Sequence, residues 1–276
     1  MGKNKRIFEL DALRGIAVIL MICHHFMWDV RYVLKLDLFS FQEGDFFNYF
    51  LQPFFVCVFV MISGICCVLS RNNLVRALRL FVAAIVVSVV TAIASLIMLK
   101  TGEISSLSRD GLFVFFNVIH LLTVGTFICW IVQMIEHKVL LKRHTEEYAR
   151  KYFSELVTGG LIVAGALIML FVPLVEKLSY RNNIWIFLPI GILPDNIISM
   201  GDYLPMVPWL GVFLIGISVG RTMYAEKKSA FPDAPAALRK ISVPFEFVGR
   251  NAIWFYLIHW PVIKAILIAG RHLGLF

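Results

Sequence analysis

Seven apolar runs, each about as long as a membrane-crossing helix, constrain this chain more than any other feature. A helix needs about 20 mainly apolar residues to cross a bilayer. The chain leaves no polar block large enough for a separate soluble domain, because 59% of its 276 residues are hydrophobic and only 16% are charged. The pattern predicts an all-α fold, a polytopic bundle of about seven transmembrane helices, in a single membrane domain over residues 1–276. The runs cover residues 11–30, 47–69, 77–99, 112–135, 156–175, 206–220 and 251–270.

A further apolar stretch, residues 184–198, is too short for a typical span. It contains Pro189 and Pro194, which interrupt the backbone hydrogen bonds of a helix. Cytoplasmic loops of membrane proteins are enriched in Lys and Arg. With seven helices and a cytoplasmic N-terminus, 17 Lys and Arg lie inside and seven outside, whereas an eighth helix places 12 on each side. The count favours seven helices and predicts that 184–198 is a short re-entrant or interfacial segment on the outer face.

Two segments on the predicted cytoplasmic side connect the runs. Residues 136–155 mix charged and apolar side chains, which suits an amphipathic surface helix, an extension of the fourth helix or, most simply, a solvated linker helix. Residues 225–247 contain Pro232, Pro235 and Pro244, which favours an irregular connector.

The net charge and the cysteines argue against two classes of function. Most Lys and Arg lie in short loops, where membrane orientation explains the net charge of +8, so nucleic acid is not an expected partner. All the cysteines fall inside or at the edge of apolar runs, so we expect packed or lipid-facing thiols rather than disulfides or metal ligands. They are Cys23, Cys57, Cys66, Cys67 and Cys129.

The first run carries an unusual set of ionisable residues. It lacks a small-residue cleavage site, so we expect a membrane helix rather than a removable signal peptide. An Arg or Asp near the centre of a membrane helix costs about 2.5 to 3.5 kcal/mol on insertion. At about 100° per residue, the side chains of Asp11, Arg14, His25 and Asp29 share one stripe, and His24 points about 100° away. The stripe indicates either a structural ion pair with a hydrogen-bonded histidine, or a polar cavity.

Two further runs each contain one histidine, His120 and His259. Each alone is typical of a core histidine with satisfied hydrogen bonds, but three histidines on three helices favour a shared polar site. At the start of the sixth run, Asp202, Tyr203 and Trp209 form either part of an aromatic belt or the outer part of a binding site.

Four motifs in order resemble one enzyme family. They are RIFELDALRGIAVILMICHHFMWD (6–29), FNVIHLLTVG (116–125), DYLPMVPWLGVFLIGISVGR (202–221) and VGRNAIWFYLIHWPV (248–262). Together they resemble the catalytic domain of heparan-alpha-glucosaminide N-acetyltransferase in its shorter bacterial form, a relative of the transmembrane acyltransferase superfamily. The first motif also resembles inner-membrane O-acyltransferases, which carry an Arg followed by ten residues and a His, the spacing of Arg14 and His25.

The resemblance implies that acetyl moves from cytoplasmic acetyl-CoA to an amine or hydroxyl of an extracytoplasmic glycan or amino sugar. Neutral imidazole suits the base that such a transfer needs. We therefore expect His25 to be the base or a transient acetyl carrier, assisted by His120 and His259, with Arg14 and Asp11 at the cytoplasmic end. Asp29, Asp202, Tyr203 and Trp209 are the candidate acceptor-binding residues. The candidate acetyl-CoA-binding cations are Arg71, Arg76, Arg79, Arg239, Lys240 and Arg250.

The resemblance also implies a location and partners. We expect a bacterial cytoplasmic membrane, membrane lipids, acetyl-CoA as co-substrate, a sugar acceptor and no metal, with a homodimer as one expected assembly. Three alternatives stay open at this point. The same intramembrane residues suit a transporter or proton-coupled carrier; a haem or quinone protein would use axial histidines; and an acyltransferase could instead use a hydroxyl of an envelope polysaccharide.

Overall fold

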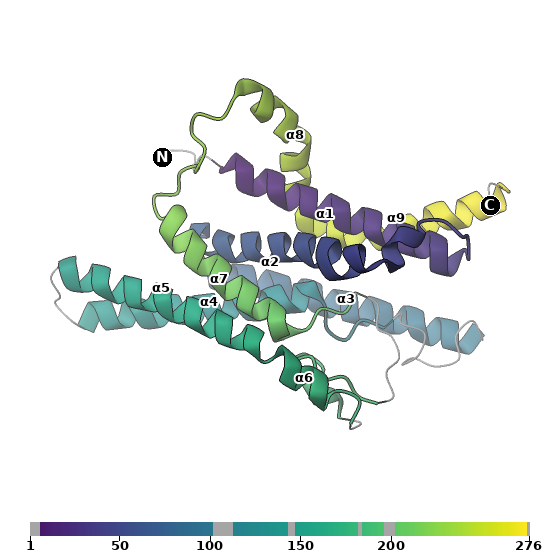
Figure 1. Ribbon diagram of the computed structural model, residues 1–276, viewed down its shortest axis with the longest axis horizontal. Helices are drawn as coiled ribbons and strands as arrows, with labels where there is room; N and C mark the ends of the chain where they lie inside the picture. The colour runs from purple at the N-terminus through teal and green to yellow at the C-terminus, as the bar shows by residue number, and fades with distance from the viewer. Residues whose placement is uncertain (1–5, 102–112, 143–146, 182–183, 196–201, 275–276) are drawn as a thin grey trace. The chain divides into compact units, whose positions relative to one another are not determined.

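The computed structural model describes residues 6–101, 113–142, 147–181, 184–195 and 202–274 (Figure 1). Within these ranges, seven helices are long and apolar enough to cross a membrane. This confirms the predicted all-α bundle. The spans are Phe8–Val33, Phe46–Leu69, Asn73–Thr101, Val118–Val139, Lys151–Leu178, Met206–Met223 and Ala252–Arg271.

The chain forms two compact units, residues 1–62 with 226–276 and residues 63–225. The single membrane domain that the sequence predicts stays a prediction. The first unit contains α1 (Phe8–Trp28), a π-helical turn (Asp29–Val33), a 3-10 turn (Ser40–Glu43), a second π-helical turn (Phe46–Leu51), the start of α2 (Gln52–Leu69), α8 (Ala236–Arg250) and α9 (Ala252–His272). The second unit contains the end of α2, α3 (Asn73–Thr101), α4 (Val118–Lys142), α5 (Glu147–Leu170), α6 (Val172–Leu178), a 3-10 turn (Trp185–Phe187) and α7 (Met206–Met223).

In the first unit, α1 packs against α8 through direct backbone contact. A Cβ atom placed on Gly15 would lie 1.9 Å from the Phe245 carbonyl oxygen, and one on Gly249 would lie 1.8 Å from the Asp11 carbonyl oxygen. Small residues allow helix backbones in membranes to approach this closely. The two glycines therefore set the distance between α1 and α8.

In the second unit, glycines serve the same purpose at two helix contacts. Gly165 of α5 and Gly211 of α7 face each other, because a Cβ on either would lie 2.7 or 2.5 Å from the carbonyl oxygen of the other. Gly125 of α4 makes room for the Phe213 ring of α7, which is fully buried. The core of this unit thus forms where α4 and α5 meet α7.

The prediction of an irregular connector over 225–247 is wrong for its second half, which is the helix α8. Pro235 immediately precedes the helix, a position where the missing N–H costs nothing. Pro244 lies inside the helix and is exposed. The helix is amphipathic: Glu246 lies on the buried side, whereas Ile241 and Phe247 are 64% and 61% exposed. Packing on α1 and an apolar outer face stabilise this helix, although the prolines in its sequence favoured an irregular connector.

The fourth helix begins later than predicted, at Val118 instead of residue 112, although residue 112 itself lies outside the described ranges. The Asn117 carboxamide oxygen accepts hydrogen bonds from the backbone N–H groups of Ile119 (3.1 Å) and His120 (3.4 Å), which ends the helix on this side. Residues 113–116 are apolar but not helical, and Asn117 pairs with Tyr203 in an isolated bridge. An N-terminal cap, rather than the end of the apolar run, sets the boundary.

Residues 136–142 and 147–155 belong to α4 and α5, because α4 extends to Lys142 and α5 begins at Glu147. The alternative that the segment extends the fourth helix is confirmed for 136–142, and the favoured interpretation, a solvated linker helix, is wrong for the described residues. Residues 143–146 lie outside the described ranges.

The described part of the short apolar stretch, residues 184–195, contains one 3-10 turn and no longer helix. Backbone hydrogen bonds join it to the start of α7, from the N–H of Met206 to the Pro189 oxygen (2.8 Å) and from the N–H of Val207 to the Ile190 oxygen (3.1 Å). This agrees with the prediction that the stretch is not a span. Its assignment to the outer face stays a prediction.

Seven spans place the two ends of the chain on opposite sides of the membrane. A reporter fused after Phe276 should therefore read as extracytoplasmic, and one fused before Met1 as cytoplasmic. Alkaline phosphatase and green fluorescent protein fusions measure this. A cytoplasmic signal at both ends would overturn the seven-helix topology.

A methyl group at the α1–α8 contact should destabilise the protein. We expect Gly249→Ala to lower the free energy of unfolding by about 1 to 3 kcal/mol, because its Cβ would overlap the Asp11 carbonyl oxygen and force the backbones apart. Thermal unfolding in detergent measures the effect. The control is Gly159→Ala in α5, whose Cβ would meet nothing within 4 Å and which should be neutral or stabilising. Equal unfolding temperatures for the two variants would contradict the close contact.

Candidate functional site

The polar stripe of α1 faces α8 and α9 along its whole length. Near its start, the Asp11 carboxylate lies 3.7 Å from the Arg14 guanidinium and 3.4 Å from that of Arg250. Arg14 also donates a hydrogen bond to the Gly249 carbonyl oxygen (3.3 Å), and Arg250 forms an ion pair with Glu246. The expected Asp11–Arg14 ion pair is present, and it belongs to a larger network that joins α1 to the end of α8.

Further along the same stripe, His25 of α1 meets His259 of α9. Their ring centroids are 5.1 Å apart, and both side chains are half-buried. The Nδ1 atom of His259 is hydrogen-bonded to the Tyr256 carbonyl oxygen. A carbonyl only accepts, so Nδ1 carries the hydrogen and Nε2 is the basic nitrogen of the neutral ring. Two of the three predicted histidines are thus neighbours.

His24 lies on a different face of α1, as predicted. Its ring centroid is 5.2 Å from that of Phe47 and 6.3 Å from that of Phe55, both aromatic side chains of the first unit. The His24 and His25 ring centroids are 5.6 Å apart, but only His25 shares the polar stripe.

At the end of the stripe, Asp29 forms an ion pair that the sequence analysis missed. The Lys264 ammonium of α9 lies 2.8 Å from one oxygen of the Asp29 carboxylate, and the two side chains are 25% and 9% exposed. Lys264 is an ionisable residue inside the last apolar run, five positions after His259. That position alone was a signal of a functional or paired residue.

His120 belongs to the second unit, at the start of α4. Its Nε2 lies 3.2 Å from the Ser88 hydroxyl, and its Nδ1 lies 2.8 Å from the Asn117 carboxamide oxygen. Ser88 in turn donates to the Val114 carbonyl oxygen (2.9 Å). These contacts are those of a histidine that stabilises a helix start, and a part in the reaction stays a prediction.

Three acceptor-binding candidates, Asp202, Tyr203 and Trp209, lie before and within α7 in the second unit. The Tyr203 hydroxyl donates to the Leu188 carbonyl oxygen (2.6 Å), and burial raises the pKa of this phenol, so the hydroxyl stays protonated. Asp202 has a left-handed backbone (φ 54°) and, like Trp209, is half-buried. Tyr203 thus ties the 184–195 segment to the start of α7.

The six candidate acetyl-CoA-binding cations divide into two groups. Arg71, Arg79 and Lys240 are exposed and have no hydrogen-bond or ion-pair partner among the residues that the structure describes. The others have partners in the protein: Arg76 donates to the Ser63 carbonyl oxygen (3.3 Å), the guanidinium of Arg239 lies 4.1 Å from the centroid of the Phe8 ring, and Arg250 pairs with Asp11 and Glu246. Arg239 and Arg250 are exposed as well, so the lack of a partner, rather than exposure, makes Arg71, Arg79 and Lys240 the better candidates for binding phosphate.

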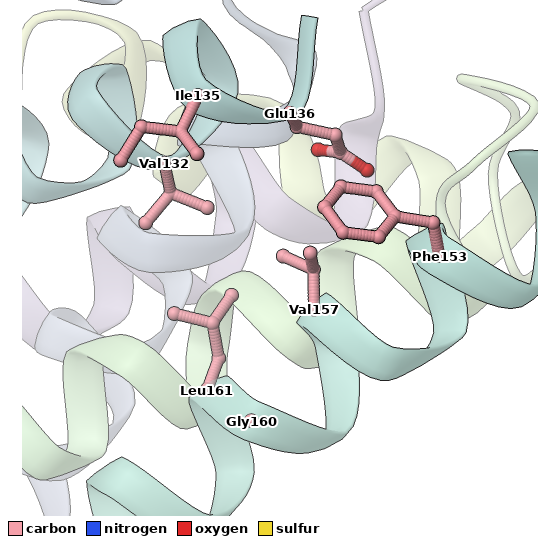
Figure 2. Close-up of a pocket in the computed structure, with 7 residues that line it drawn as sticks. All are labelled: Val132, Ile135, Glu136, Phe153, Val157, Gly160 and Leu161. Atoms are coloured by element: carbon pink, nitrogen blue, oxygen red, sulfur yellow. The ribbon is translucent and has the colours of Figure 1, made fainter. Parts of the chain in front are cut away.

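An open apolar groove of ≈ 240 Å³ lies between α4 and α5 (Figure 2). Its one ionisable lining residue is Glu136, and this carboxylate is already bound by Arg221. The groove therefore offers no reactive group, and the stripe of α1 is the stronger candidate site. The lining residues are Val132, Ile135, Glu136, Phe153, Val157, Gly160 and Leu161.

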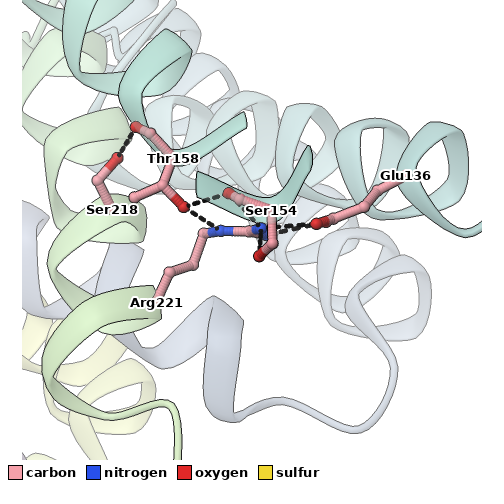
Figure 3. A network of polar contacts seen from close by, with 5 residues as sticks. All are labelled: Glu136, Ser154, Thr158, Ser218 and Arg221. Carbon is pink, nitrogen blue, oxygen red and sulfur yellow. Dashed lines mark hydrogen bonds and ion pairs between the residues drawn. The ribbon is translucent and has the colours of Figure 1, made fainter. Parts of the chain in front are cut away.

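Arg221 is the centre of a polar network that the sequence analysis counted only as loop charge (Figure 3). Its guanidinium binds both oxygens of the Glu136 carboxylate, at 2.7 and 2.9 Å. It also donates to the hydroxyls of Ser154 and Thr158, each at 2.8 Å, and Ser218 donates to the Thr158 carbonyl oxygen (3.0 Å). The network joins α4, α5 and α7, which gives it a structural role.

Neither a metal centre nor a disulfide is found in the described part of the chain. None of its His, Cys, Asp and Glu side chains form a group of three or more that could hold a metal ion. Its five cysteines are free thiols, and Cys67 and Cys129 are buried.

Comparison with known proteins gives one match. A family model described as heparan-alpha-glucosaminide N-acetyltransferase, catalytic, matches residues 6–145 and 150–261. The match covers the polar stripe of α1, His120, α7, α8 and the first part of α9. No curated protein and no solved structure matches the chain.

Breaking the Arg221–Glu136 pair should destabilise the protein strongly. We expect Arg221→Met to cost about 3 to 5 kcal/mol of unfolding free energy, because it leaves the Glu136 carboxylate, 14% exposed, without its cation. The double variant Arg221→Met/Glu136→Gln should recover part of that loss. Thermal unfolding of the two proteins measures the coupling.

The matched control is Lys228→Met, which breaks an ion pair of 2.8 Å between exposed side chains and should change stability little. If Arg221→Met unfolds at the same temperature as this control, the network is not a structural centre.

Proposed function

Because the chain belongs to the heparan-alpha-glucosaminide N-acetyltransferase catalytic-domain family, we propose that it transfers acetyl from cytoplasmic acetyl-CoA to a sugar amine or hydroxyl across the membrane. Family membership and the seven apolar helices identify a multi-pass membrane acetyltransferase. The donor, the acceptor and the roles of individual residues belong to the proposal. The location of the protein in a bacterial cytoplasmic membrane, with its N-terminus on the cytoplasmic side, is also part of the proposal.

The observation that carries the proposal is the contact between His25 and His259. An acetyl transfer from a thioester needs a base that removes a proton from the attacking amine or hydroxyl. Neutral imidazole is suited to this near neutral pH. Two imidazoles 5.1 Å apart, on a stripe with ion pairs at either end, provide a base in a polar part of an apolar bundle.

In the direct route, His25 accepts a proton from the acceptor N–H or O–H as its nitrogen or oxygen attacks the acetyl carbonyl carbon. The resulting tetrahedral oxyanion collapses, the carbon–sulfur bond breaks, and coenzyme A leaves as a thiolate that takes up the proton. Hydrogen-bond donors near the carbonyl would stabilise the oxyanion. The acetylated acceptor and coenzyme A are the products.

In the alternative route, His25 itself attacks the thioester carbonyl carbon, the carbon–sulfur bond breaks, and coenzyme A leaves with the ring N–H proton while the acetyl group stays on a ring nitrogen. The acceptor then attacks this acetyl-imidazole, and its N–H or O–H proton passes to the ring, which leaves as neutral His25. The two routes differ in one observable, because only the second transfers acetyl from acetyl-CoA to the protein without an acceptor. His259 assists in either route through its basic Nε2.

The two ends of the stripe suggest how donor and acceptor approach. The network of Asp11, Arg14 and Arg250 lies at the end that is predicted to be cytoplasmic. We propose that exposed Arg71, Arg79 and Lys240 contribute to binding the coenzyme A phosphates, since a cation on the surface is accessible to phosphate. Asp29, at the opposite end of the stripe, and Asp202, Tyr203 and Trp209 are proposed to contact the acceptor.

The test is coenzyme A release from acetyl-CoA by detergent-purified protein supplied with amino sugars and envelope glycans. We expect release that depends on an acceptor, and a loss of about a hundredfold or more in His25→Ala, because general base catalysis contributes factors of this size. The matched control is His24→Gln, which changes the adjacent histidine on a different face and should retain the rate within a few-fold.

Full transfer by folded His25→Ala would overturn the role of His25. Movement of sugar across vesicles without coenzyme A release would instead support the transporter. Acetyl label retained on wild-type protein and absent from His25→Ala would establish the carrier route.

A further inference from the structure

The Asp29–Lys264 ion pair is buried inside two helices that cross the membrane. Asp29 follows α1 in a π-helical turn, Lys264 lies in α9, and their charged groups are 2.8 Å apart. Ionisable residues inside membrane spans are rare and are usually retained for a function. A structural pair, such as Arg221 with Glu136, has both carboxylate oxygens bound. The Asp29 pair differs from it in this respect.

Lys264 binds only one oxygen of the Asp29 carboxylate. The second, Oδ2, is buried and has no hydrogen-bond partner among the residues that the structure describes. Gln42 in the 3-10 turn Ser40–Glu43 is 3% exposed, and both its carboxamide nitrogen and oxygen lack partners within the same ranges. Buried polar groups are normally hydrogen-bonded, and each exception needs an explanation.

Asp29 and Gln42 are close in sequence to two residues that form one ion-pair cluster. Arg31, two positions after Asp29, binds both oxygens of the Glu43 carboxylate (2.8 and 3.0 Å), and Glu43 directly follows Gln42. The Tyr32 hydroxyl donates to the same carboxylate (2.8 Å). Hydrogen bonds from Arg31 and Tyr32 lower the pKa of Glu43, so the cluster stays charged. It holds the turn that contains Gln42 against the end of α1.

The Asp29–Lys264 pair adjoins the proposed reaction centre. Asp29 comes one helical turn after His25, a rise of about 6 Å along the axis. Lys264 follows His259 by five positions on α9. The Asp29 oxygen without a partner is therefore at the end of the stripe opposite Arg14, one helical turn from His25.

We propose that Asp29 and Gln42 bind a neutral hydroxyl group of the acceptor, and that Lys264 is the positioning residue that makes the site select a hydroxyl over a cation. This inference rests on the proposed function, since it specifies how the acceptor binds. Lys264 fixes Asp29 through one oxygen and neutralises its charge, so the second oxygen accepts an O–H without attracting a cation. The Gln42 carboxamide both donates and accepts, as a hydroxyl requires.

The test uses glucose and glucosamine at pH 6, where the amine of glucosamine is protonated, with the full-length protein in detergent. The readout is the ratio of the two dissociation constants measured by calorimetry. Wild-type protein should bind glucose at least as tightly as glucosamine. In Lys264→Met, the unpaired Asp29 carboxylate should shift the ratio about tenfold or more toward glucosamine, because charged hydrogen-bond partners are the stronger ones. An equal loss of both sugars, or no change, would overturn the positioning role.

A second variant covers the case in which Lys264→Met does not fold. Asp29→Asn/Lys264→Met removes both charges, and replacing a buried ion pair by neutral residues usually preserves folding. It should bind both sugars about tenfold more weakly or worse, without preference for the cation. Wild-type affinity for both sugars would overturn the site.

Gln42→Met tests the other half of the site. It replaces a buried carboxamide by an apolar side chain of similar shape, so the unfolding temperature should stay the same or rise, whereas both sugars should bind about three- to tenfold more weakly. Unchanged affinity, or a lower unfolding temperature, would show that Gln42 serves the fold.

The matched control is the charge exchange Glu226→Lys/Lys228→Glu, an exposed pair with the same 2.8 Å separation. It should leave the ratio unchanged, and a shift as large as that of Lys264→Met would overturn the proposal. Coenzyme A release, measured in parallel, distinguishes a failure of this acceptor site from a failure of the proposed acetyltransferase activity. Turnover without the ratio shift leaves the acetyltransferase and removes this site, whereas the ratio shift without turnover leaves the site and removes the acetyltransferase. Absence of any sugar binding to wild-type protein would overturn the site.

Discussion

The backbone contact between α1 and α8 determines where the residues of the candidate site meet. Gly15 and Gly249 bring the two helices together without intervening side chains. Because α9 begins three residues after Gly249, the contact also fixes where α9 starts beside α1. His259 and Lys264 then lie opposite His25 and Asp29. The contact between these two glycines therefore determines how the polar pairs along the stripe are aligned.

Much of the architecture could be predicted from the sequence because it depends on local quantities. The number of membrane helices follows from the length of each apolar run, and the shared face of Arg14 and His25 follows from the period of one helix. The start of α4 could not be predicted in this way, because an Asn117 cap ends the helix inside an apolar segment. The helix α8 could not either, since its stability comes from packing on α1 and outweighs the prolines. The partner of Lys264 could not be predicted either, because the lysine and its carboxylate are far apart in the sequence and meet only in the folded chain.

The two units differ in how they compensate the free-energy cost of burying charged side chains. Arg221 and Glu136 satisfy each other and the surrounding hydroxyls, so the network is closed and contributes to folding. Asp11 is shared between two guanidiniums, and Asp29 is bound through one oxygen only. Charges that are incompletely satisfied lie on the same stripe as His25. Polar groups in an apolar bundle are therefore informative when their hydrogen bonds are counted atom by atom.

The outward apolar face of α8 has a mechanical consequence. A helix of 15 residues is too short to cross a bilayer, and an apolar outer face favours the boundary between lipid and water over either phase. Such a helix stays at the depth of the membrane interface. Because α8 is joined to α1 by backbone contact, α1 has to follow when the bilayer becomes thinner or thicker and α8 is displaced. The height of His25 in the membrane is then set by lipid thickness as well as by the protein.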